Sequence, residues 1–471
     1  MRKRLLLMEP PFYRLMESGY GLTRFPLGLG YLAAAASQAT AWEVRVFNGD
    51  FVPRAAPFRV TYLTGEGFQR YRENLLYTEA APWREAGQAL ASLRPGVVGI
   101  SLKSPTLAAG LALARLAKAM DPEVLVVAGG PHVTAVGPAV LEHPELDLAV
   151  LGEGEVSLVE LLRALEQGGD VALVPGLALR RGRIPTATAA RPPLPDLDVL
   201  PWPRPIAQGA LWDQDRYPPA AFKGLLASRG CPRRCFYCGS RSIWGRVRRR
   251  RPEAVAAEAA DLLKRGLGTL HFEDDTFGVD GAYLGQLCQG LARRCPGLAF
   301  TCETHVSLIT LPALELLQEA GCVGIQLGIE SGSDRTLRAM RKGFSIEQAL
   351  AACRLVTRRG LRLECFFMVG LPQEDETSLR QTLEVIKAID CDKVIYSIFT
   401  PYPGTEAFAY CQEHGLIGVD FDPSRHNHQS PANCFCRHIA PKRFRQLAGQ
   451  VEKAVEFRNA ARRAGMDEPT P

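Results

Sequence analysis

Three cysteines stand close together in the stretch GCPRRCFYCG near the middle of the chain. Cys231, Cys235 and Cys238 follow the spacing C-x3-C-x2-C. A structural zinc site takes four ligands, and the only other tight pair, Cys434 and Cys436, comes far later in the chain. A [4Fe–4S] cluster is normally held by four cysteines, so three would leave one iron free to bind and activate a small molecule. The spacing predicts such a cluster, ahead of zinc or of unligated buried thiols.

The remaining cysteines do not form a disulfide pattern. The chain has 13 cysteines, and none precedes Cys231. The N-terminal sequence MRKRLLLMEPPF has too short an apolar run for a signal peptide, which needs roughly 7–15 apolar residues. No stretch reaches the ~18 apolar residues of a membrane span. We therefore expect a cytoplasmic protein without a membrane span, whose reduced thiols are metal ligands or small buried side chains.

Length and charge set the broad class of protein. The 471 residues are too many for one hydrophobic core, so two or three domains are expected. The net charge is +6, and the one basic run is RVRRRR at 246–251. Because no aromatic residues alternate with these arginines, a solvated edge before a helix is favoured over a nucleic-acid site. We expect no nucleic-acid partner.

Apolar runs alternate with helical patterns in the N-terminal third of the chain. Each predicted strand is followed by a helical pattern, which is typical of a doubly wound parallel sheet, a Rossmann-like α/β domain. Such sheets bind ligands at the carboxyl ends of their strands. The predicted strands are 4–10, 44–50, 97–104, 124–131 and 146–155, and the predicted helices are 26–39, 105–120, 136–143 and 156–166.

A second α/β domain follows a proline-rich stretch. Residues 168–220 contain PPLPDLDVLPWPRP, which has too many prolines for regular structure and predicts a linker packed across a surface. Six βα units then predict a (β/α)6 partial TIM barrel, with strands at 224–230, 269–275, 299–305, 324–330, 362–370 and 394–401. The expected divisions are 1–167, 168–220, 221–415 and 416–471, and the last contains a loop and a helix over 441–463 that cap the barrel.

One face of several predicted barrel strands is polar. Gln326, Gly328 and Glu330 alternate with apolar residues in one strand, and Glu303 and His305 share a face in another. Alternate residues of a barrel strand face the lumen, and a packed barrel fills its lumen with branched apolar side chains. The pattern therefore predicts a lumen that holds a polar ligand. The alternative, an antiparallel sheet with solvated faces, conflicts with the βα alternation.

The second domain resembles the radical S-adenosylmethionine (SAM) superfamily over roughly 220–415. The resemblance lies in the cysteine triad and in EDDTF, GIESGS, MVGLPQE and YPGTE, which begin at 273, 328, 368 and 402. It implies that the free iron chelates SAM and that an electron donor such as flavodoxin or ferredoxin allows cleavage to a 5′-deoxyadenosyl radical. Relatives usually carry Arg rather than His at the position of His305. The SAM contacts that it implies are Tyr237, Glu273, Asp274, Glu303, His305, Glu330, Val369 and Pro372.

The first domain resembles the cobalamin-binding domain that precedes the barrel in one radical SAM subgroup. PP, PLGLGYLA, SLKSPT, GGPHVTA and LGEGE carry this resemblance, each at the carboxyl end of a predicted strand. No histidine has Asp two residues before it, so the D-x-H-x-x-G cobalt-ligating motif is absent. We expect the lower face of cobalt to be empty, water-bound or near Lys103, with His132 as a turn residue. The implied cobalamin contacts are Pro10, Leu27, Ser101, Lys103, Ser104, Gly129, Gly130, His132, Val133, Gly152, Glu153 and Gly154.

Together the two resemblances imply a monomeric enzyme that methylates an unactivated carbon of a small-molecule or natural-product substrate with methylcobalamin. The alternative is an oxidative cyclase or ring-rearranging enzyme, like the anaerobic Mg-protoporphyrin monomethyl ester cyclases. A non-catalytic corrinoid- or metal-binding protein would not need an open iron or a polar lumen. Radical SAM methylthiotransferases need three N-terminal cysteines, which this chain lacks. Tyr396 and Phe399 either line the substrate or adenine end or belong to the core.

The segment NHQSPANCFC near the C-terminus is expected to touch substrate. Cys434 and Cys436 are expected to be packing residues, because two ligands are too few for a cluster. A second metal site that includes His426 and His428 is the alternative.

Overall fold

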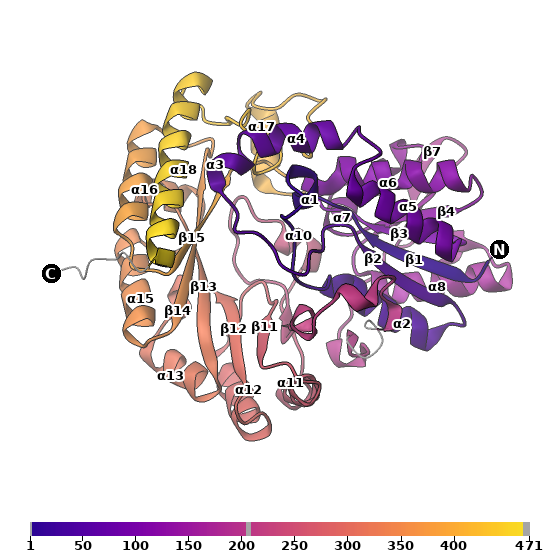
Figure 1. The fold of residues 1–471 in the computed structure, drawn as a ribbon, viewed down its shortest axis with the longest axis horizontal. Coiled ribbons are helices and arrows are strands. Elements are labelled where there is room, and N and C mark those ends of the chain that lie inside the picture. Colours follow the sequence, from indigo (N-terminus) through magenta and orange to yellow (C-terminus); the bar gives the residue numbers. More distant parts are fainter. Residues whose placement is uncertain (1, 204–208, 465–471) are drawn as a thin grey trace.

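The computed structural model describes residues 2–203 and 209–464 (Figure 1). It contains a seven-stranded and a six-stranded sheet, which lie side by side with helices around them. Two stretches of the predicted divisions, 204–208 of the linker and 465–471 of the C-terminal segment, lie outside the described residues.

The first sheet is the predicted doubly wound domain. Its first five strands are parallel and run in the order β2-β1-β3-β4-β5, so the strand order reverses between β1 and β3. The runs RLLLME and VVGIS are almost entirely buried, because helices cover both faces of the sheet. The strands are β1 (Arg4–Glu9), β2 (Glu43–Asn48), β3 (Val97–Ser101), β4 (Leu125–Gly129) and β5 (Leu148–Val150). The main helices are α2 (Leu27–Ala39), α5 (Ala81–Leu93), α6 (Leu107–Met120) and α8 (Gly154–Gln167).

Several elements of this domain differ from the prediction. Helix α7 (Pro131–Val136) begins directly after β4 rather than at 136, because Gly130 turns the chain with a φ of 102° and Pro131 suits the first helical position. A short 3-10 helix (Gly137–Glu142) follows it. Three helices between β2 and β3 were not predicted, namely α3 (Val60–Leu63), α4 (Glu66–Asn74) and α5.

The proline-rich stretch contains regular structure at its start. Strands β6 (Leu177–Arg181) and β7 (Ile184–Ala187) form a hairpin that extends the first sheet antiparallel from β5. The hairpin turns at Gly182, which has a φ of 64°. The prolines that predicted a linker gather after residue 191, so the prediction of no regular structure was wrong for the first part of 168–220.

The second sheet is the predicted partial barrel. All six strands are parallel, in the order β15-β14-β13-β12-β11-β8, and helices lie along the outer side of the curved sheet (Figure 1). The strands are β8 (Gly224–Leu225), β11 (Thr269–Phe272), β12 (Ala299–Thr304), β13 (Cys322–Glu330), β14 (Arg362–Val369) and β15 (Lys393–Ile398). The helices are α11 (Pro252–Lys264), α12 (Gly281–Arg294), α13 (Leu311–Glu319), α14 (Asp334–Ala339), α15 (Ile346–Arg358), α16 (Glu376–Ala388) and α17 (Glu406–Glu413).

The first barrel strand is shorter than predicted. After β8 the chain leaves the barrel, and β9 (Ser228–Arg229) pairs antiparallel with β10 (Arg248–Arg249). The Asp274 carboxylate causes this turn, because it accepts hydrogen bonds from Ala227 N at 2.9 Å and from the Ser228 hydroxyl at 2.5 Å.

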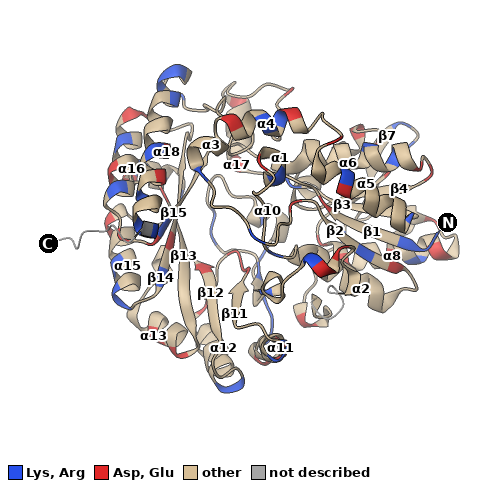
Figure 2. Ribbon diagram, viewed as in Figure 1, with Lys and Arg blue, Asp and Glu red and all other residues tan. Residues whose placement is uncertain are grey.

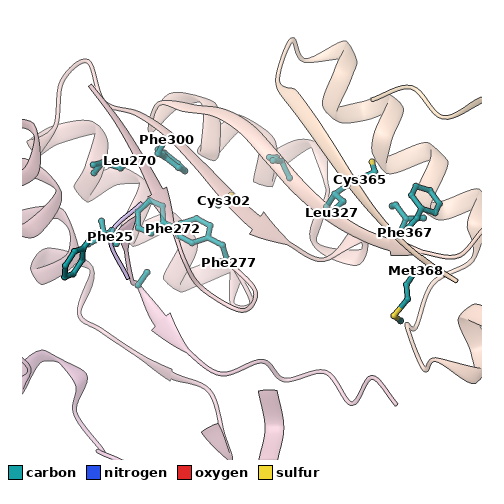
Figure 3. Packing of buried hydrophobic residues seen from close by; sticks show 14 of the residues in the cluster. Phe25, Leu270, Phe272, Phe277, Phe300, Cys302, Leu327, Cys365, Phe367 and Met368 are labelled. Carbon is teal, nitrogen blue, oxygen red and sulfur yellow. The ribbon is translucent and has the colours of Figure 1, made fainter. Parts of the chain in front are cut away.

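The barrel core lies between the strands and the outer helices. Figure 3 shows Phe272, Phe277 and Phe300 together at β11 and β12, and their rings are 4.5–6.1 Å apart. On β13, Leu327 is fully buried on this outer face, whereas Gln326 on the other face is only half-buried. The polar residues of the barrel strands therefore face the lumen, as predicted.

The C-terminal segment lies across both domains. Phe12 of the first domain stacks on His428 at 5.6 Å, and Phe399 of the barrel contacts Phe435 at 5.8 Å. Helix α18 (Pro441–Ala464) then packs beside α16 and β15. Among the described residues, no helix is long and apolar enough to cross a membrane.

Candidate functional site

The cysteine loop lies between β9 and α10 (Ser240–Trp244), at the carboxyl end of the barrel. The Cys231 sulfur is 3.1 Å from the Thr276 hydroxyl, and the Cys238 sulfur accepts a hydrogen bond from Ser240 N at 3.4 Å. The backbone of Phe236 fixes the middle of the loop, since its N–H donates to the Met340 carbonyl and its carbonyl accepts from Ala407 N, both at 3.1 Å. The loop is therefore anchored to the ends of two barrel units.

Asp275 joins the two ends of this loop, although the sequence argument singled out its neighbours instead. Its carboxylate accepts hydrogen bonds from Gly230 N at 3.1 Å and from the Ser240 hydroxyl at 3.0 Å. Burial raises the pKa of Asp275, and these hydrogen bonds lower it in part. Gly230 precedes the first cysteine and Ser240 follows the last, so one side chain sets the width of the loop.

The cysteine side chains suit an iron–sulfur cluster better than a single ion. Although Cys238 is exposed as a residue, desolvation of its sulfur raises the pKa of the thiol to about 11. Desolvation also raises the pKa of Cys235, so each thiolate needs a cationic ligand to form. In the described part of the chain, no three His, Cys, Asp or Glu side chains converge closely enough to hold one metal ion. A cubic cluster separates its cysteine ligands more widely than one ion does, so these three thiols stay the predicted ligands of a cluster rather than of a single ion.

A charged group of side chains lies in the lumen beside the loop. The Tyr237 hydroxyl donates to Glu330 at 2.9 Å, and the buried Lys342 ammonium lies 3.2 Å from the same carboxylate. Glu330 has a φ of 72°, which is rare for a residue with a side chain, at an irregularity in the β13 pairing. Gly328 leaves room for this carboxylate, because a Cβ there would lie 2.6 Å from its oxygen.

Glu303 adds a second carboxylate to this group. Burial, followed by the carboxylates of Glu330 and Asp275, raises the pKa of Glu303 to about 7. Lys342 acts in the opposite direction. The lumen therefore presents Tyr237, Glu303 and Glu330 together, and Lys342 is a member that the sequence argument missed.

The other predicted SAM residues have different surroundings. Both Asp274 oxygens bind the β8–β9 backbone turn, and His305 binds the Lys342 carbonyl and the Ser307 hydroxyl, each at 2.9 Å. Burial lowers the pKa of His305 to about 4. Asp274 and His305 therefore support the local structure rather than present a free charge to the lumen.

Three further predicted residues lie beyond the lumen group. Glu273 forms a bidentate ion pair with Arg24 of the first domain, at 2.8 and 2.9 Å. Val369 and Pro372 are buried at the end of β14, where the Pro372 carbonyl accepts from Arg437 N at 3.0 Å. Tyr396 and Phe399, 5% and 0% exposed, belong to the packed core.

A cavity of about 400 Å³ lies between the two domains. One wall is formed by the carboxyl ends of the first sheet, at the point where its strand order reverses. The opposite wall comes from the barrel, through Leu226, Arg229, Trp244 and Glu273. The predicted cobalamin residues that line it are Leu27, Ser101, Lys103, Gly129, Gly130, Gly152, Glu153 and Gly154.

This cavity fits a large planar ligand. Added Cβ atoms at Gly28 and Gly152 would have no neighbour within 4 Å, so bare backbone faces open space there. Four predicted contacts, Pro10, Ser104, His132 and Val133, do not line the cavity. His132 instead binds the Ser104 hydroxyl at 2.9 Å, and none of the described lining residues is a histidine. The Lys103 ammonium does reach the cavity, where it pairs with Glu9 at 2.5 Å.

Arg229 lines the cavity and lies next to the cysteine loop. Like Lys342, it was not predicted from the sequence. Its guanidinium donates to Glu153 at 2.7 Å and to Glu155 at 2.5 Å, two carboxylates of the LGEGE stretch. It lies 5.3 Å from the Tyr31 ring and 5.4 Å from the Trp244 ring. Arg229 is two residues before Cys231, so this ion pair fixes the loop relative to the first domain.

The basic run 246–251 is largely internal. Arg248 is buried against Glu153 at 2.7 Å, and Arg250 is buried against Glu258 at 2.5 Å. The interpretation of a solvated edge was therefore wrong for these two residues, whose charges stabilise the contact between segments of the fold.

The two C-terminal histidines have separate partners, whereas Cys434 and Cys436 contact each other. His426 Nδ1 lies 3.2 Å from the Asn433 amide oxygen, and His428 Nδ1 lies 3.4 Å from the Tyr402 hydroxyl. The Cys434 thiol donates to the Ile439 carbonyl at 3.8 Å. These contacts favour packing roles over a second metal site.

Comparison with known proteins identifies both domains. The B12 binding domain family matches residues 20–162, and the radical SAM superfamily matches residues 225–386. The chain therefore combines a B12-binding domain with a radical SAM domain and belongs to the cobalamin-dependent radical SAM enzymes. The cofactors of these two domains are cobalamin and SAM with a [4Fe–4S] cluster.

Individual relatives and solved structures agree with this assignment. An uncharacterised methyltransferase of Pyrococcus horikoshii is 27% identical over 88% of this chain and 84% of its own length. The anaerobic magnesium-protoporphyrin IX monomethyl ester cyclase of Rubrivivax gelatinosus is 28% identical over 81% of this chain and 70% of its own. The radical SAM methyltransferase TsrM from Kitasatospora setae, solved with cobalamin and a [4Fe–4S] cluster, has the same fold, with a TM-score of 0.68, 18% identity and coverage of 97% and 89%.

Proposed function

We propose that the protein methylates an unactivated carbon of a small-molecule substrate. The observation that carries this proposal is the cavity shared by the two domains, whose barrel wall includes Arg229, two residues from the first cysteine. When bound, the cofactors would supply a 5′-deoxyadenosyl radical, which removes a hydrogen atom, and a methyl group carried by cobalamin. A shared wall brings both groups to one substrate position.

The chain's own residues hold and orient these groups. Cys231, Cys235 and Cys238 would hold the cluster, with the loop width set by Asp275. Glu303 and Glu330 place negative charge where the cationic amine and sulfonium of SAM would bind. The Tyr237 and Lys342 contacts orient the Glu330 carboxylate before SAM arrives, so little reorganisation is needed.

The C-terminal segment completes the proposed site by covering it. Its contacts with Phe12 and Phe399 bridge the first domain and the barrel. Excluding water protects a reactive radical from side reactions. We propose that this cover, residues 416–440 with α18, belongs to the same functional unit as the barrel at 221–415 and the cobalamin domain at 1–167.

Names of relatives favour methyl transfer over cyclisation. Besides the Pyrococcus methyltransferase, the Streptomyces wedmorensis cytidylyl-2-hydroxyethylphosphonate methyltransferase is 23% identical over 88% of this chain. The second candidate function is an oxidative cyclase without methyl transfer, which the Rubrivivax relative supports. We further propose a cytoplasmic monomer that receives electrons from a flavodoxin or ferredoxin.

The test follows the methyl group and does not need the substrate. The anaerobically reconstituted protein, loaded with cobalamin and reduced, is incubated with SAM carrying a deuterated methyl group. Methyl transfer predicts deuterated methylcobalamin and S-adenosylhomocysteine by mass spectrometry. If SAM yields only 5′-deoxyadenosine and the bound cobalamin stays unlabelled, the cyclase candidate replaces methylation.

A further inference from the structure

The cysteine loop reaches the molecular surface. Cys238 is exposed, whereas Cys231 and Cys235 are half-buried. The surrounding surface is formed by α10, by the end of α14 and by the start of α17. These segments are contiguous, because the Phe236 backbone bonds Met340 and Ala407, and a Cβ at Gly239 would lie 3.9 Å from Thr405. This surface gives a short route from solvent to the cysteines.

The surface around the loop carries unpaired positive charge. Arg234, Arg241, Arg246 and Arg338 are all exposed, and none of them forms an ion pair among the described residues. Arg234 lies inside the loop and Arg241 follows it in α10. The backbone of Arg246 approaches Gly230 at the start of the loop, and Arg338 is two residues before Met340. Glu406, an exposed acid at the start of α17, already pairs with Arg341 at 2.7 Å.

Basic and acidic side chains are paired on the exposed surface formed by α16 and α18. Figure 2 shows basic and acidic residues mixed along α16 and α18. There Glu376 pairs with both Arg380 at 3.0 Å and Arg443 at 2.8 Å. Within the basic run after α10, Arg248 and Arg250 are neutralised internally, by Glu153 and Glu258 respectively. The four arginines near Cys238 lack the ion pairs that offset positive charge along α16 and α18.

We propose that this surface, formed by Arg234, Arg241, Arg246 and Arg338 around Cys238, docks an acidic one-electron donor protein. The proposal rests on the radical SAM function. The reduced donor would lose one electron, and the cluster that Cys231, Cys235 and Cys238 would hold would accept it. Complementary charge accelerates encounter and orients the donor with its redox centre towards Cys238. Exposed guanidinium groups contribute mainly to association and little to the stability of the fold.

The test compares two ways of supplying the electron. The variant R241Q/R246Q/R338Q removes three charges near the loop, and the control R183Q/R293Q/R294Q removes three exposed charges distant from it, on the β6–β7 hairpin and at the end of α12. Rates of 5′-deoxyadenosine formation are measured with a flavodoxin, its reductase and NADPH, and separately with dithionite. We expect about a tenfold loss for the first variant with flavodoxin at low salt. With dithionite, both variants should match the wild type.

Binding is measured independently of turnover. The Kd of the flavodoxin for each protein is determined by calorimetry from about 50 to 300 mM salt. We expect weaker binding and a flatter salt dependence only in R241Q/R246Q/R338Q. Equal behaviour of the two variants would overturn the docking surface, as would an equal loss with dithionite. Tighter binding of a fluorescent tRNA than of flavodoxin, lost in the same variant, would assign the arginines to nucleic acid instead. Wild-type SAM cleavage with dithionite tests the proposed function separately.

Discussion

Loss of the Cys235 thiol should remove the iron–sulfur cluster and leave cobalamin bound. Cys235→Ala leaves two thiolates in the loop, which is too few to hold a [4Fe–4S] cluster. Iron should fall from ~4 per chain to below ~1, and 5′-deoxyadenosine formation should stop. Cobalamin retention should be unchanged, because the cavity lining does not include Cys235. Cys434→Ala is the matched control, and a similar loss of iron in that variant would restore the C-terminal cysteines as ligands.

Glu303 makes the affinity for SAM depend on pH. Its pKa of about 7, raised by burial and then by Glu330 and Asp275, lies above its ordinary value of 4.5. The side chain is therefore neutral below pH 7 and becomes an anion as the pH rises through 7. An extra anion beside a cationic ligand contributes about 1 kcal/mol, or roughly fivefold in Kd.

Binding of SAM to the wild type and to Glu303→Gln should therefore diverge as the pH rises from 6 to 8. The ratio of the two Kd values is the measurement, because the titration of SAM itself affects both proteins equally. The wild type should bind more tightly only at the upper end. A constant ratio would remove Glu303 from the SAM site.

At the residue scale, spacing predicted candidate cluster ligands but not the orientation of neighbouring side chains. The cysteine triad was recognisable because three cysteines fall within eight residues. In EDD, by contrast, Glu273 pairs with Arg24, Asp274 binds the β8–β9 turn and Asp275 binds the loop. Consecutive side chains point in different directions at the end of a strand, so the acidic motif alone could not assign these roles. Lys342 reaches Glu330 only because α14 returns the chain to the lumen.

At the element scale, buried parallel strands were predictable because helices on both faces make them continuous apolar runs. The β6–β7 hairpin lacks that signal, since most of its residues are only partly buried or exposed. The short β9–β10 pairing depends on Asp274, whose effect is tertiary. The hairpin was therefore missed for lack of a burial signal, and the β9–β10 pairing was missed because it relies on a distant side chain.

The contact between β9 and the LGEGE turn stabilises the packing of the barrel against the first domain. Burial raises the pKa of Glu153, but hydrogen bonds from Arg248 and Arg229 outweigh this and lower it overall. Arg229→Ala would leave Glu155 buried without its cation, which costs about 3 kcal/mol. For a domain of this size, that lowers Tm by roughly 6–12 °C.

Two further variants separate the charge effect from lost packing. Arg229→Met with Glu155→Gln removes the unpaired charge and should recover more than half of the lost Tm. Arg265→Ala breaks the exposed pair with Asp261 and should have almost no effect. Thermal unfolding followed by circular dichroism measures all three. If the double variant is no more stable than Arg229→Ala, the packing of the Arg229 side chain, rather than its charge, stabilises the fold.

At the scale of the whole molecule, the two cofactor sites share a wall yet should be separable by mutation. Gly28 lies on α2 at the cavity, and an added Cβ there meets no atom within 4 Å. Gly28→Leu would project a side chain into the space for the corrin ring, and Leu stabilises a helix relative to Gly by about 1 kcal/mol. Loss of cobalamin in this variant would therefore not reflect unfolding. Gly87→Leu is the control, because Gly87 is equally open on α5 but does not line the cavity.

Metal analysis after anaerobic reconstitution with hydroxocobalamin and desalting gives the result. The wild type and Gly87→Leu should retain about four irons and one cobalt per chain. Gly28→Leu should keep its iron and its dithionite-driven SAM cleavage while cobalt falls by roughly tenfold, an effect expected of an overfilled site. Methyl transfer from labelled SAM should then disappear with the cobalt. If Gly28→Leu retains one cobalt per chain, the corrin ring binds outside this cavity. The shared cavity would then no longer be an argument for methyl transfer.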